Sequence, residues 1–354
     1  MRFHRLNIKD IRPETAHCVS IAFDVPEQLK TEFSFKQGQY LTLKAHINGE
    51  EVRRSYSICS APSDNELRVA IKEVAEGVFS TFANRVLKKG DALEAMPPKG
   101  HFFAPLSIAA QKHYVFFAAG SGITPVISNI KAVLMTEPLS NCTLIYGNRH
   151  ISSIIFKEEI EALKNRYLGR LQVFNVLSRE RTESDLLHGR LNKAKITQFF
   201  DKIPNLLSAD EFFSCGPIEM TEAVQEYLKA QGIEEDKLHF ELFNAPPPRP
   251  KGESALTETL WGEAVALIKL DGLSFEVPIN KGQNILEAAQ AVGADMPYAC
   301  KGGVCCTCRA KLIEGNIEMN ANYALTKEEV AQGFVLTCQA IPKTERIVVD
   351  FDIK

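Results

Sequence analysis

The first hundred residues alternate apolar and polar positions in short runs, with glycine and proline between them. Residues 41–45 (Leu-Thr-Leu-Lys-Ala) and residues 67–71 (Leu-Arg-Val-Ala-Ile) are two such runs. A period of two residues is typical of strands with one buried face, and several short strands separated by turn residues favour an antiparallel barrel. We therefore expect residues 1–106 to form an antiparallel β-barrel domain.

The pattern changes after residue 106, where longer apolar runs alternate with segments of helical periodicity. Four of these runs predict buried parallel strands, at residues 114–118, 142–146, 171–177 and 211–215. Apolar strands that alternate with helices are typical of a doubly wound α/β domain, in which helices cover both faces of a parallel sheet. We assign residues 107–243 to such a domain.

A proline-rich stretch then interrupts the pattern of elements. Residues 244–252 read Asn-Ala-Pro-Pro-Pro-Arg-Pro-Lys-Gly, a composition that forms neither a regular helix nor a strand. We expect a semi-rigid linker over residues 244–257, followed by a separate domain over residues 258–354.

Turn and cap residues define the elements of this last domain. Asp271-Gly272 stands between two alternating runs and is a strong hairpin signal. Asn284 and Thr326 are each followed three residues later by glutamate, which predicts a helix start, and Gly333 predicts the end of the second helix. A hairpin with two short helices indicates a small α+β domain.

Composition and charge exclude several classes of partner. The chain has 354 residues, of which 45% are hydrophobic, and a net charge of -3, so it has no positive field that would bind a nucleic-acid backbone or an anionic membrane surface. Residues 1–6 lack the apolar core of a signal peptide, and no apolar run is long enough to span a bilayer. We expect a cytoplasmic protein with no nucleic-acid or membrane partner.

Four of the nine cysteines carry the strongest chemical signal. Cys300, Cys305 and Cys308 have the spacing C-x4-C-x2-C, and Cys338 follows thirty residues later. This spacing is that of plant-type [2Fe-2S] ligands, because three thiolates can converge on a compact cluster from one tight loop. A zinc site is the alternative, but zinc loops usually pair two CxxC motifs and no second pair is present. We interpret Cys306 as a spare cysteine that points away from the iron.

Two segments of the barrel contain residue types that suit a flavin. Arg54-Ser55-Tyr56-Ser57 supplies a cation for phosphates, an aromatic ring for stacking and hydroxyl donors, although an aromatic residue on a strand is usually part of the core. Gly77-Val78-Phe79-Ser80 follows a strand and predicts a helix start, whose free amides can bind a phosphate. A plain junction between loop and helix is an equally good interpretation of the second segment alone.

Three further segments stand at the ends of predicted parallel strands, where ligands bind in such folds. One segment predicts a pyrophosphate-binding site: Gly120-Ser121-Gly122-Ile123-Thr124-Pro125, with Thr124 as the N-cap and Pro125 as the first helical residue. Ser178 and Arg179 can bind a 2′-phosphate and so favour NADPH over NADH. Cys215-Gly216 lies where a nicotinamide can approach, although a cysteine that ends a buried strand is the simpler interpretation.

In chain order these motifs resemble the ferredoxin-NADP reductase family fused to a C-terminal ferredoxin, and the resemblance covers essentially the whole chain. It implies FAD, with Arg54 at its pyrophosphate, Tyr56 on its ring, Ser57 near its reactive nitrogen and residues 77–80 around its phosphates. It also implies NADPH, held by residues 120–124 and Arg179, and a β-grasp-like fold for the [2Fe-2S] domain.

The resemblance also implies a direction of electron flow. A hydride from NADPH carries two electrons and a [2Fe-2S] cluster accepts one, so a flavin must hold the pair and release it in halves. Residues 144–149, 185–190 and 297–305 look most like reductase subunits that serve a di-iron oxygenase acting on an aromatic acyl-CoA. The implied partner is the oxygenase component of a multicomponent monooxygenase. A different aromatic-ring oxygenase is the nearest alternative, and a non-catalytic redox sensor with negligible NADPH turnover is a remote one.

Overall fold

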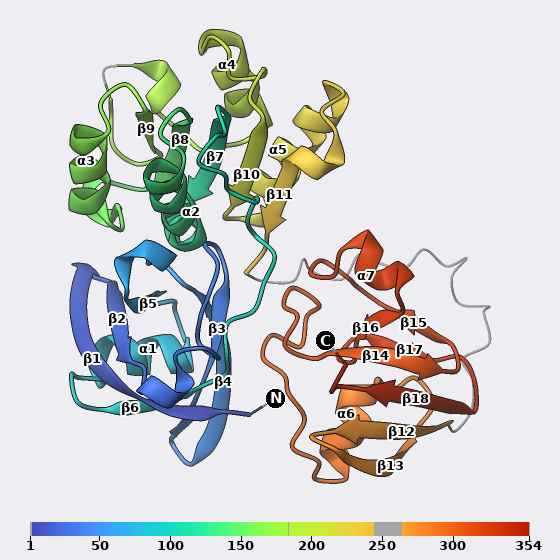
Figure 1. Cartoon of the computed structure of the whole chain (residues 1–354). Helices are drawn as coiled ribbons and strands as arrows, with labels where there is room; N and C mark the ends of the chain where they lie inside the picture. Colours follow the sequence, from blue (N-terminus) through green and yellow to red (C-terminus); the bar gives the residue numbers. More distant parts are fainter. Residues whose placement is uncertain (1, 183, 244–263, 354) are drawn as a thin grey trace. The chain divides into compact units, whose positions relative to one another are not determined.

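The computed structural model describes residues 2–182, 184–243 and 264–353. One compact unit holds almost all of residues 4–243, and a second holds the C-terminal residues from 264 onward. The linker expected at residues 244–257 lies outside the described residues. Figure 1 colours the first unit from blue to yellow and the second from orange to red.

The N-terminal part of the first unit is the antiparallel barrel that the alternation predicts. Its strands run in the order β4-β3-β6-β1-β2-β5. A bridge between Ile58 and Val69 joins β5 to the chain that leaves β4, so the sheet closes on itself. Helix α1 contributes Phe79 and Ala83 to the barrel core. The elements are β1 (His4–Thr15), β2 (Cys18–Asp24), β3 (Tyr40–Ile47), β4 (Glu50–Ser57), β5 (Leu67–Lys72), α1 (Val78–Arg85) and β6 (Ala92–Ala95), with short 3-10 helices η1 (Glu27–Leu29) and η2 (Pro62–Asp64).

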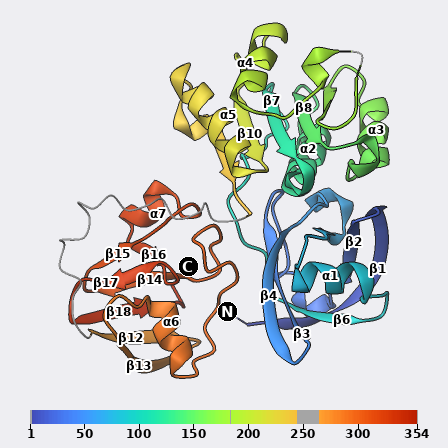
Figure 2. The ribbon, with the colours of Figure 1, turned by 180° about the vertical axis from the view of Figure 1, so that it is seen from behind.

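The rest of the unit is a five-stranded parallel sheet in the order β11-β10-β7-β8-β9. Helices α2 and α3 cover one face and α4 and α5 cover the other, as Figures 1 and 2 show from opposite sides. The elements are β7 (His113–Ala119), η3 (Gly120–Gly122), α2 (Ile123–Thr136), β8 (Asn141–Asn148), η4 (Ile151–Ser153), α3 (Lys157–Arg166), β9 (Leu171–Leu177), η5 (Asp185–Leu187), α4 (Lys193–Lys202), β10 (Glu211–Cys215), α5 (Ile218–Ala230), η6 (Glu235–Lys237) and β11 (Leu238–Glu241).

All four parallel strands expected from the sequence are present, but one strand and one helix start differ from the prediction. Strand β11 was not predicted, because its four residues (Leu-His-Phe-Glu) are too few and too polar to give a clear strand pattern in the sequence. Helix α2 begins at Ile123 after the 3-10 turn Gly120–Gly122, so Thr124 is not the N-cap. Its hydroxyl donates to the Ser121 carbonyl (3.0 Å), which makes it part of the turn and not a cap for the helix amides.

The C-terminal unit is a mixed sheet in the order β13-β12-β18-β14-β16, with α6 packed on it and a small β15-β17 ribbon beside it. Strands β12 and β18 run parallel at its centre, which is the expected β-grasp-like arrangement. The Asp271-Gly272 turn and the caps at Asn284 and Thr326 form as predicted. The elements are β12 (Ala264–Leu270), β13 (Leu273–Ile279), α6 (Ile285–Ala291), β14 (Arg309–Glu314), β15 (Ile317–Met319), α7 (Lys327–Ala331), β16 (Phe334–Leu336), β17 (Ala340–Pro342) and β18 (Arg346–Asp350).

None of the helices in the described part of the chain has the length and apolar character needed to cross a bilayer.

Candidate flavin, nicotinamide and iron-sulfur sites

The two candidate flavin segments meet inside the first unit. The ring of Tyr56, at the end of β4, lies 5.5 Å from the ring of Phe79 in α1, centroid to centroid. Phe79 is buried in the barrel core, whereas Tyr56 is only partly buried. Phe79 therefore packs against the Tyr56 ring from the barrel core, and Tyr56 remains a candidate for stacking on a flavin.

The start of α1 is shaped for a close ligand. Gly77 is its N-cap, and no side chain caps the first amides. A Cβ atom on Gly77 would lie 2.3 Å from the Ser80 hydroxyl, so a larger residue there would have to displace Ser80. Ser80 is buried, and its hydroxyl accepts from the Val74 amide and donates to the Gly77 carbonyl. Ser80 thus braces the turn, and the amides from Val78 onward are the groups that can bind a flavin phosphate.

The other predicted members of this segment are less constrained. Arg54 is exposed, and its guanidinium donates to the Arg53 carbonyl (2.7 Å). Ser55 is partly buried. Arg54 therefore remains a candidate for the flavin pyrophosphate through its charge, because a single contact to a neighbouring carbonyl leaves most of its five donors available.

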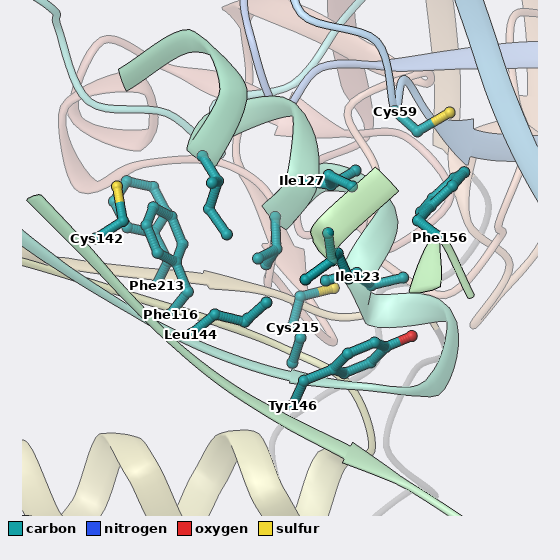
Figure 3. Packing of buried hydrophobic residues seen from close by; sticks show 14 of the residues in the cluster. Cys59, Phe116, Ile123, Ile127, Cys142, Leu144, Tyr146, Phe156, Phe213 and Cys215 are labelled. Atoms are coloured by element: carbon teal, nitrogen blue, oxygen red, sulfur yellow. The ribbon is translucent and has the colours of Figure 1, made fainter. Parts of the chain in front are cut away.

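The pyrophosphate loop and the Cys215-Gly216 segment form one surface. A Cβ atom on Gly122 would lie 2.0 Å from the Cys215 carbonyl oxygen, and one on Gly216 would lie 3.2 Å from the Ala119 amide. Two glycines therefore allow the ends of β7 and β10 to approach closely. The Tyr146 hydroxyl donates to the Gly120 carbonyl (3.0 Å), and Figure 3 shows Tyr146 and Cys215 on the face of the sheet next to Ile123. These contacts fix the loop from below.

A partly buried carboxyl group that the sequence did not reveal lies beside the junction, the place where residues 120–122 meet residues 215–216. Ser57 donates from its hydroxyl to Glu241, with 3.2 Å between the two oxygens. Glu241 ends β11 beside Cys215 at the end of β10. Burial raises the pKa of Glu241 to about 8, although the hydrogen bond from Ser57 lowers it, and burial also raises the pKa of the Cys215 thiol. At neutral pH Glu241 therefore holds a proton one hydrogen bond away from Ser57.

A lysine from the barrel faces the same loop and was also missed. The Nζ atom of Lys72 lies 3.2 Å from the position that a Cβ atom on Gly120 would take. Burial lowers the pKa of Lys72, and the nearby positive charge of Arg149 lowers it further. Two like charges beside a helix start that has no side-chain cap are a suitable environment for a pyrophosphate. Only the folded chain brings Lys72 to this loop, since it lies 48 residues before Gly120 in the sequence.

Arg179 and Arg149 end neighbouring strands of the sheet. The Arg179 amide donates to the Arg149 carbonyl (2.9 Å), and the Ser178 amide donates to the Asn148 carbonyl (2.9 Å). Both arginine side chains are exposed, and within the described residues neither guanidinium forms an ion pair. This edge of the sheet therefore presents two available guanidinium groups, which can bind phosphate with paired N–H donors.

The four predicted cluster ligands come together in the second unit. The Cys300 and Cys305 sulfurs lie 3.1 Å apart, and the Cys308 and Cys338 thiols are hydrogen-bonded to each other. The described residues contain no group of three or more His, Cys, Asp or Glu side chains around a single ion position, and the four thiols form two pairs instead. Two thiolates on each of two irons is the ligand set of a [2Fe-2S] cluster, so the donors fit that group.

The loop around these thiols is tightly built. Gly303 has a φ of 75°, and a Cβ atom there would lie 2.9 Å from the Ala321 carbonyl oxygen, so the turn requires glycine. The Gly302 amide donates to the Cys300 sulfur (3.4 Å). Cys306 points elsewhere and donates to the Ala324 carbonyl (3.2 Å), in keeping with its interpretation as a spare cysteine.

Three family profiles match the chain in order along its length. They are the oxidoreductase FAD-binding domain over residues 8–103, the oxidoreductase NAD-binding domain over residues 116–226 and the 2Fe-2S iron-sulfur cluster binding domain over residues 268–343. The three correspond to the barrel, the parallel α/β sheet and the C-terminal unit.

Complete proteins of similar length also match. One of the subunits of 1,2-phenylacetyl-CoA epoxidase from Escherichia coli (strain K12) is 42% identical over 99% of this chain and 98% of its own. The ferredoxin reductase component of 3-ketosteroid-9-alpha-monooxygenase from Rhodococcus rhodochrous is 32% identical over 98% of this chain and 96% of its own. The solved structure of phthalate dioxygenase reductase, at 23% identity, superimposes with a TM-score of 0.59 over 99% of this chain and 98% of its own, which shows the shared fold.

Proposed function

The chain belongs to the family of flavin- and iron-sulfur-containing reductase subunits of oxygenases, and we propose that it passes electrons from NADPH to an epoxidase of phenylacetyl-CoA. The observation that supports this acceptor is the 42% identity, from end to end, with a subunit of 1,2-phenylacetyl-CoA epoxidase. The relative that serves a ketosteroid monooxygenase is less similar, at 32%.

The residues at the junction have distinct proposed roles. The amides of residues 120–122 and the Lys72 ammonium group hold the dinucleotide pyrophosphate. The amides carry partial positive charge and Lys72 carries a full one, and both attract the phosphate oxygens. Tyr56 supports the flavin ring, and the Ser57 hydroxyl lies next to the reactive nitrogen. When bound, FAD would supply the conversion of a two-electron hydride into single electrons for the cluster.

Glu241 has a proton-holding role in this arrangement. Its carboxyl group accepts from Ser57 and stays protonated at neutral pH, because burial raises its pKa to about 8. A neutral carboxyl group places no negative charge beside the reduced nicotinamide. It can also exchange a proton with the Ser57 hydroxyl. Cys215 and Gly216 form the floor on which the nicotinamide lies, and burial keeps the Cys215 thiol neutral.

The choice of NADPH over NADH rests on the exposed edge of the sheet. Arg179 and Arg149 follow the ends of neighbouring strands, and neither Asn148 nor Arg149, at the end of β8, is an acidic reader of the ribose 2′-hydroxyl. The nearby Glu180 carboxylate accepts from the Ile151 amide (2.9 Å). Two guanidinium groups there suit a 2′-phosphate, because bidentate contacts to phosphate oxygens are strong.

The C-terminal unit supplies the last carrier. We propose Cys300, Cys305, Cys308 and Cys338 as the ligands, with domain boundaries after residues 106 and 243, since β6 ends at Ala95, β7 begins at His113 and β11 ends at Glu241. Free thiols that must ligate iron need a reducing compartment, which favours the cytoplasm.

Two measurements test the proposal in order. Anaerobic NADPH should bleach overlapping flavin and iron-sulfur absorption bands of the purified chain, and an unbleached or colourless protein would contradict the whole electron path. Mixing the chain with the other subunits of a phenylacetyl-CoA epoxidase should then give NADPH-dependent epoxidation of phenylacetyl-CoA. One result would reject the proposed acceptor and leave the reductase function in place. In that case NADPH bleaches the bands, the epoxidase subunits give no turnover, and a ring-hydroxylating oxygenase does.

A further inference from the structure

One amide side chain in the C-terminal unit contacts both halves of the candidate cluster site. The Nε2 atom of Gln339 lies 2.9 Å from the Lys301 carbonyl oxygen and 3.6 Å from the Cys338 sulfur. Gln339 directly follows the fourth candidate ligand, whereas Lys301 directly follows the first. A single NH2 group therefore connects the two segments that supply the thiols.

The orientation of this amide follows from its neighbours. A carbonyl oxygen and a cysteine sulfur are both acceptors, so the Gln339 group that faces them must be the NH2, which has two protons to donate. With the amide reversed, its oxygen would face two acceptors and be repelled by both. Both donor positions of Nε2 are thus used, one on each segment.

The loop that Gln339 supports adopts an unfavourable backbone conformation. Lys301 has a φ of 52°, in the left-handed region that a residue with a side chain rarely adopts, and such residues persist only when their surroundings hold them. The next turn, at Gly303, packs against Gln339 itself, because a Cβ atom on Gly303 would lie 3.2 Å from Gln339 Cγ. The Gln339 stem and its amide therefore hold the loop at two left-handed residues, Lys301 and Gly303.

We infer that Gln339 is a positioning residue that holds the cluster loop against the fourth ligand and raises the reduction potential of the cluster through its hydrogen bond to Cys338. Reduction adds an electron whose charge spreads onto the thiolate sulfurs. An N–H donor at one sulfur stabilises this extra charge more than it stabilises the oxidised form, which makes the potential more positive. The inference rests on the four cysteines proposed above as ligands.

The test is a redox titration of the full chain with its flavin and cluster bound, following the electron paramagnetic resonance signal of the reduced cluster. Gln339→Leu removes both donors and keeps an aliphatic stem near Gly303. It should favour the oxidised cluster by about tenfold in the one-electron equilibrium, which is a shift of about 59 mV to more negative potential. Gln339→Glu, which replaces a donor by a charged acceptor, should shift the potential further in the same direction.

Controls separate this effect from a loss of structure. Gln332→Leu makes the same change at an exposed position after α7 and should leave the cluster potential unchanged, and the flavin potential should stay constant in all variants. If Gln339→Leu loses its cluster during purification, Gln339→Met keeps an unbranched stem against Gly303 and allows the same titration.

The possible results distinguish this inference from the ligand proposal. A wild-type chain without a reduced-cluster signal would reject the four proposed ligands. A wild-type signal with the same potential in Gln339→Leu, Gln339→Met and Gln339→Glu would reject the role of Gln339 alone and leave the ligands in place.

Discussion

The candidate cluster ligands come from two short segments of one unit, whereas the candidate flavin and nicotinamide residues are drawn from segments between Arg54 and Glu241. In the cluster loop, the cysteine side chains themselves would bond to the iron. At the junction, backbone amides and close glycine contacts shape most of the surface, and a few charged side chains add to it.

The two kinds of site should therefore respond differently to the substitution of one residue. A covalently ligated cluster depends on each of its four thiolates, so removal of one affects the whole group. A surface made of many amides and a few charges loses binding energy in parts. We therefore expect all-or-none losses at the cluster and graded losses at the junction.

The largest effect should follow Cys308→Ser in the cluster loop. Loss of one of four thiolates should abolish the cluster and with it the NADPH-dependent reduction of cytochrome c, while reduction of a dye by the flavin continues. Steady-state assays with both acceptors, together with iron content, measure this. The control Cys306→Ser should keep its cluster, since its side chain can still donate to the Ala324 carbonyl. Survival of both activities in Cys308→Ser would show that this residue is not a ligand.

Gly122→Ala should have the largest effect at the junction. The added Cβ atom would lie 2.0 Å from the Cys215 carbonyl oxygen, so the two loops must separate, which costs about 3 kcal/mol of stability. The displaced amides should lower dinucleotide affinity by roughly two orders of magnitude. NADPH and NADH should weaken equally, while FAD and the cluster remain bound. Gly169→Ala is the control, because its Cβ atom would meet open space and only the left-handed φ of 81° is strained. Normal dinucleotide affinity in Gly122→Ala would contradict the shape argument.

Arg179→Ala should discriminate between the two dinucleotides. Loss of a charge-assisted contact to the 2′-phosphate should cost about 1.5 to 3 kcal/mol for NADPH and leave NADH little changed. The ratio of kcat/KM for the two substrates measures this. Arg166→Ala, at the end of α3, removes an exposed arginine elsewhere and should not alter the ratio. An unchanged ratio in Arg179→Ala would remove this residue from the phosphate site.

Glu241 should make the stability of the first unit depend on pH. Its pKa is raised from 4.5 to about 8 in the folded chain, so the unfolded chain loses this proton first as the pH rises. Stability should therefore fall by about 1.4 kcal/mol per pH unit between roughly pH 5 and 8, and level off above pH 8. Glu241→Gln should remove this loss, which amounts to about 2 kcal/mol between pH 6 and 8.

Denaturant unfolding at several pH values, followed by flavin fluorescence, measures the effect. Glu158→Gln changes an exposed glutamate in the first turn of α3 and should leave the pH dependence of the wild type intact. Parallel pH profiles for the wild type and Glu241→Gln would show that Glu241 is ionised in the folded chain.

The smallest effect should follow Lys72→Gln, which sharpens the contrast with Arg179. Lys72 is proposed to face the pyrophosphate, a group common to both dinucleotides, so NADPH and NADH should weaken together by up to about 1 kcal/mol, or about fivefold. The difference from wild type should shrink at high salt, because ionic strength screens this contact. Lys89→Gln, an exposed lysine in the turn before β6, is a matched control. A loss confined to NADPH would place Lys72 at the 2′-phosphate instead.

Features that depend on residues close together in the chain could be predicted from the sequence alone. The spacing of Cys300, Cys305 and Cys308 predicts the cluster loop because one short loop contains three of its ligands. The caps at Asn284 and Thr326 and the Asp271-Gly272 turn follow from local hydrogen bonds and backbone preferences. Apolar periodicity predicted strands β3 and β5 of the barrel and four of the five strands of the parallel sheet, but not β11.

Which distant residues meet depends on the tertiary fold. Glu241 faces Ser57, Lys72 faces Gly120, and Gln339 bridges Lys301 and Cys338, and none of these pairs has a fixed spacing that a sequence pattern could reveal. The start of α2 was misplaced for the same reason, since the close approach of Gly122 to Cys215 accompanies a tight 3-10 turn ahead of the helix. Local propensities act over a few residues, whereas burial and close packing depend on where the fold brings the chain back to itself.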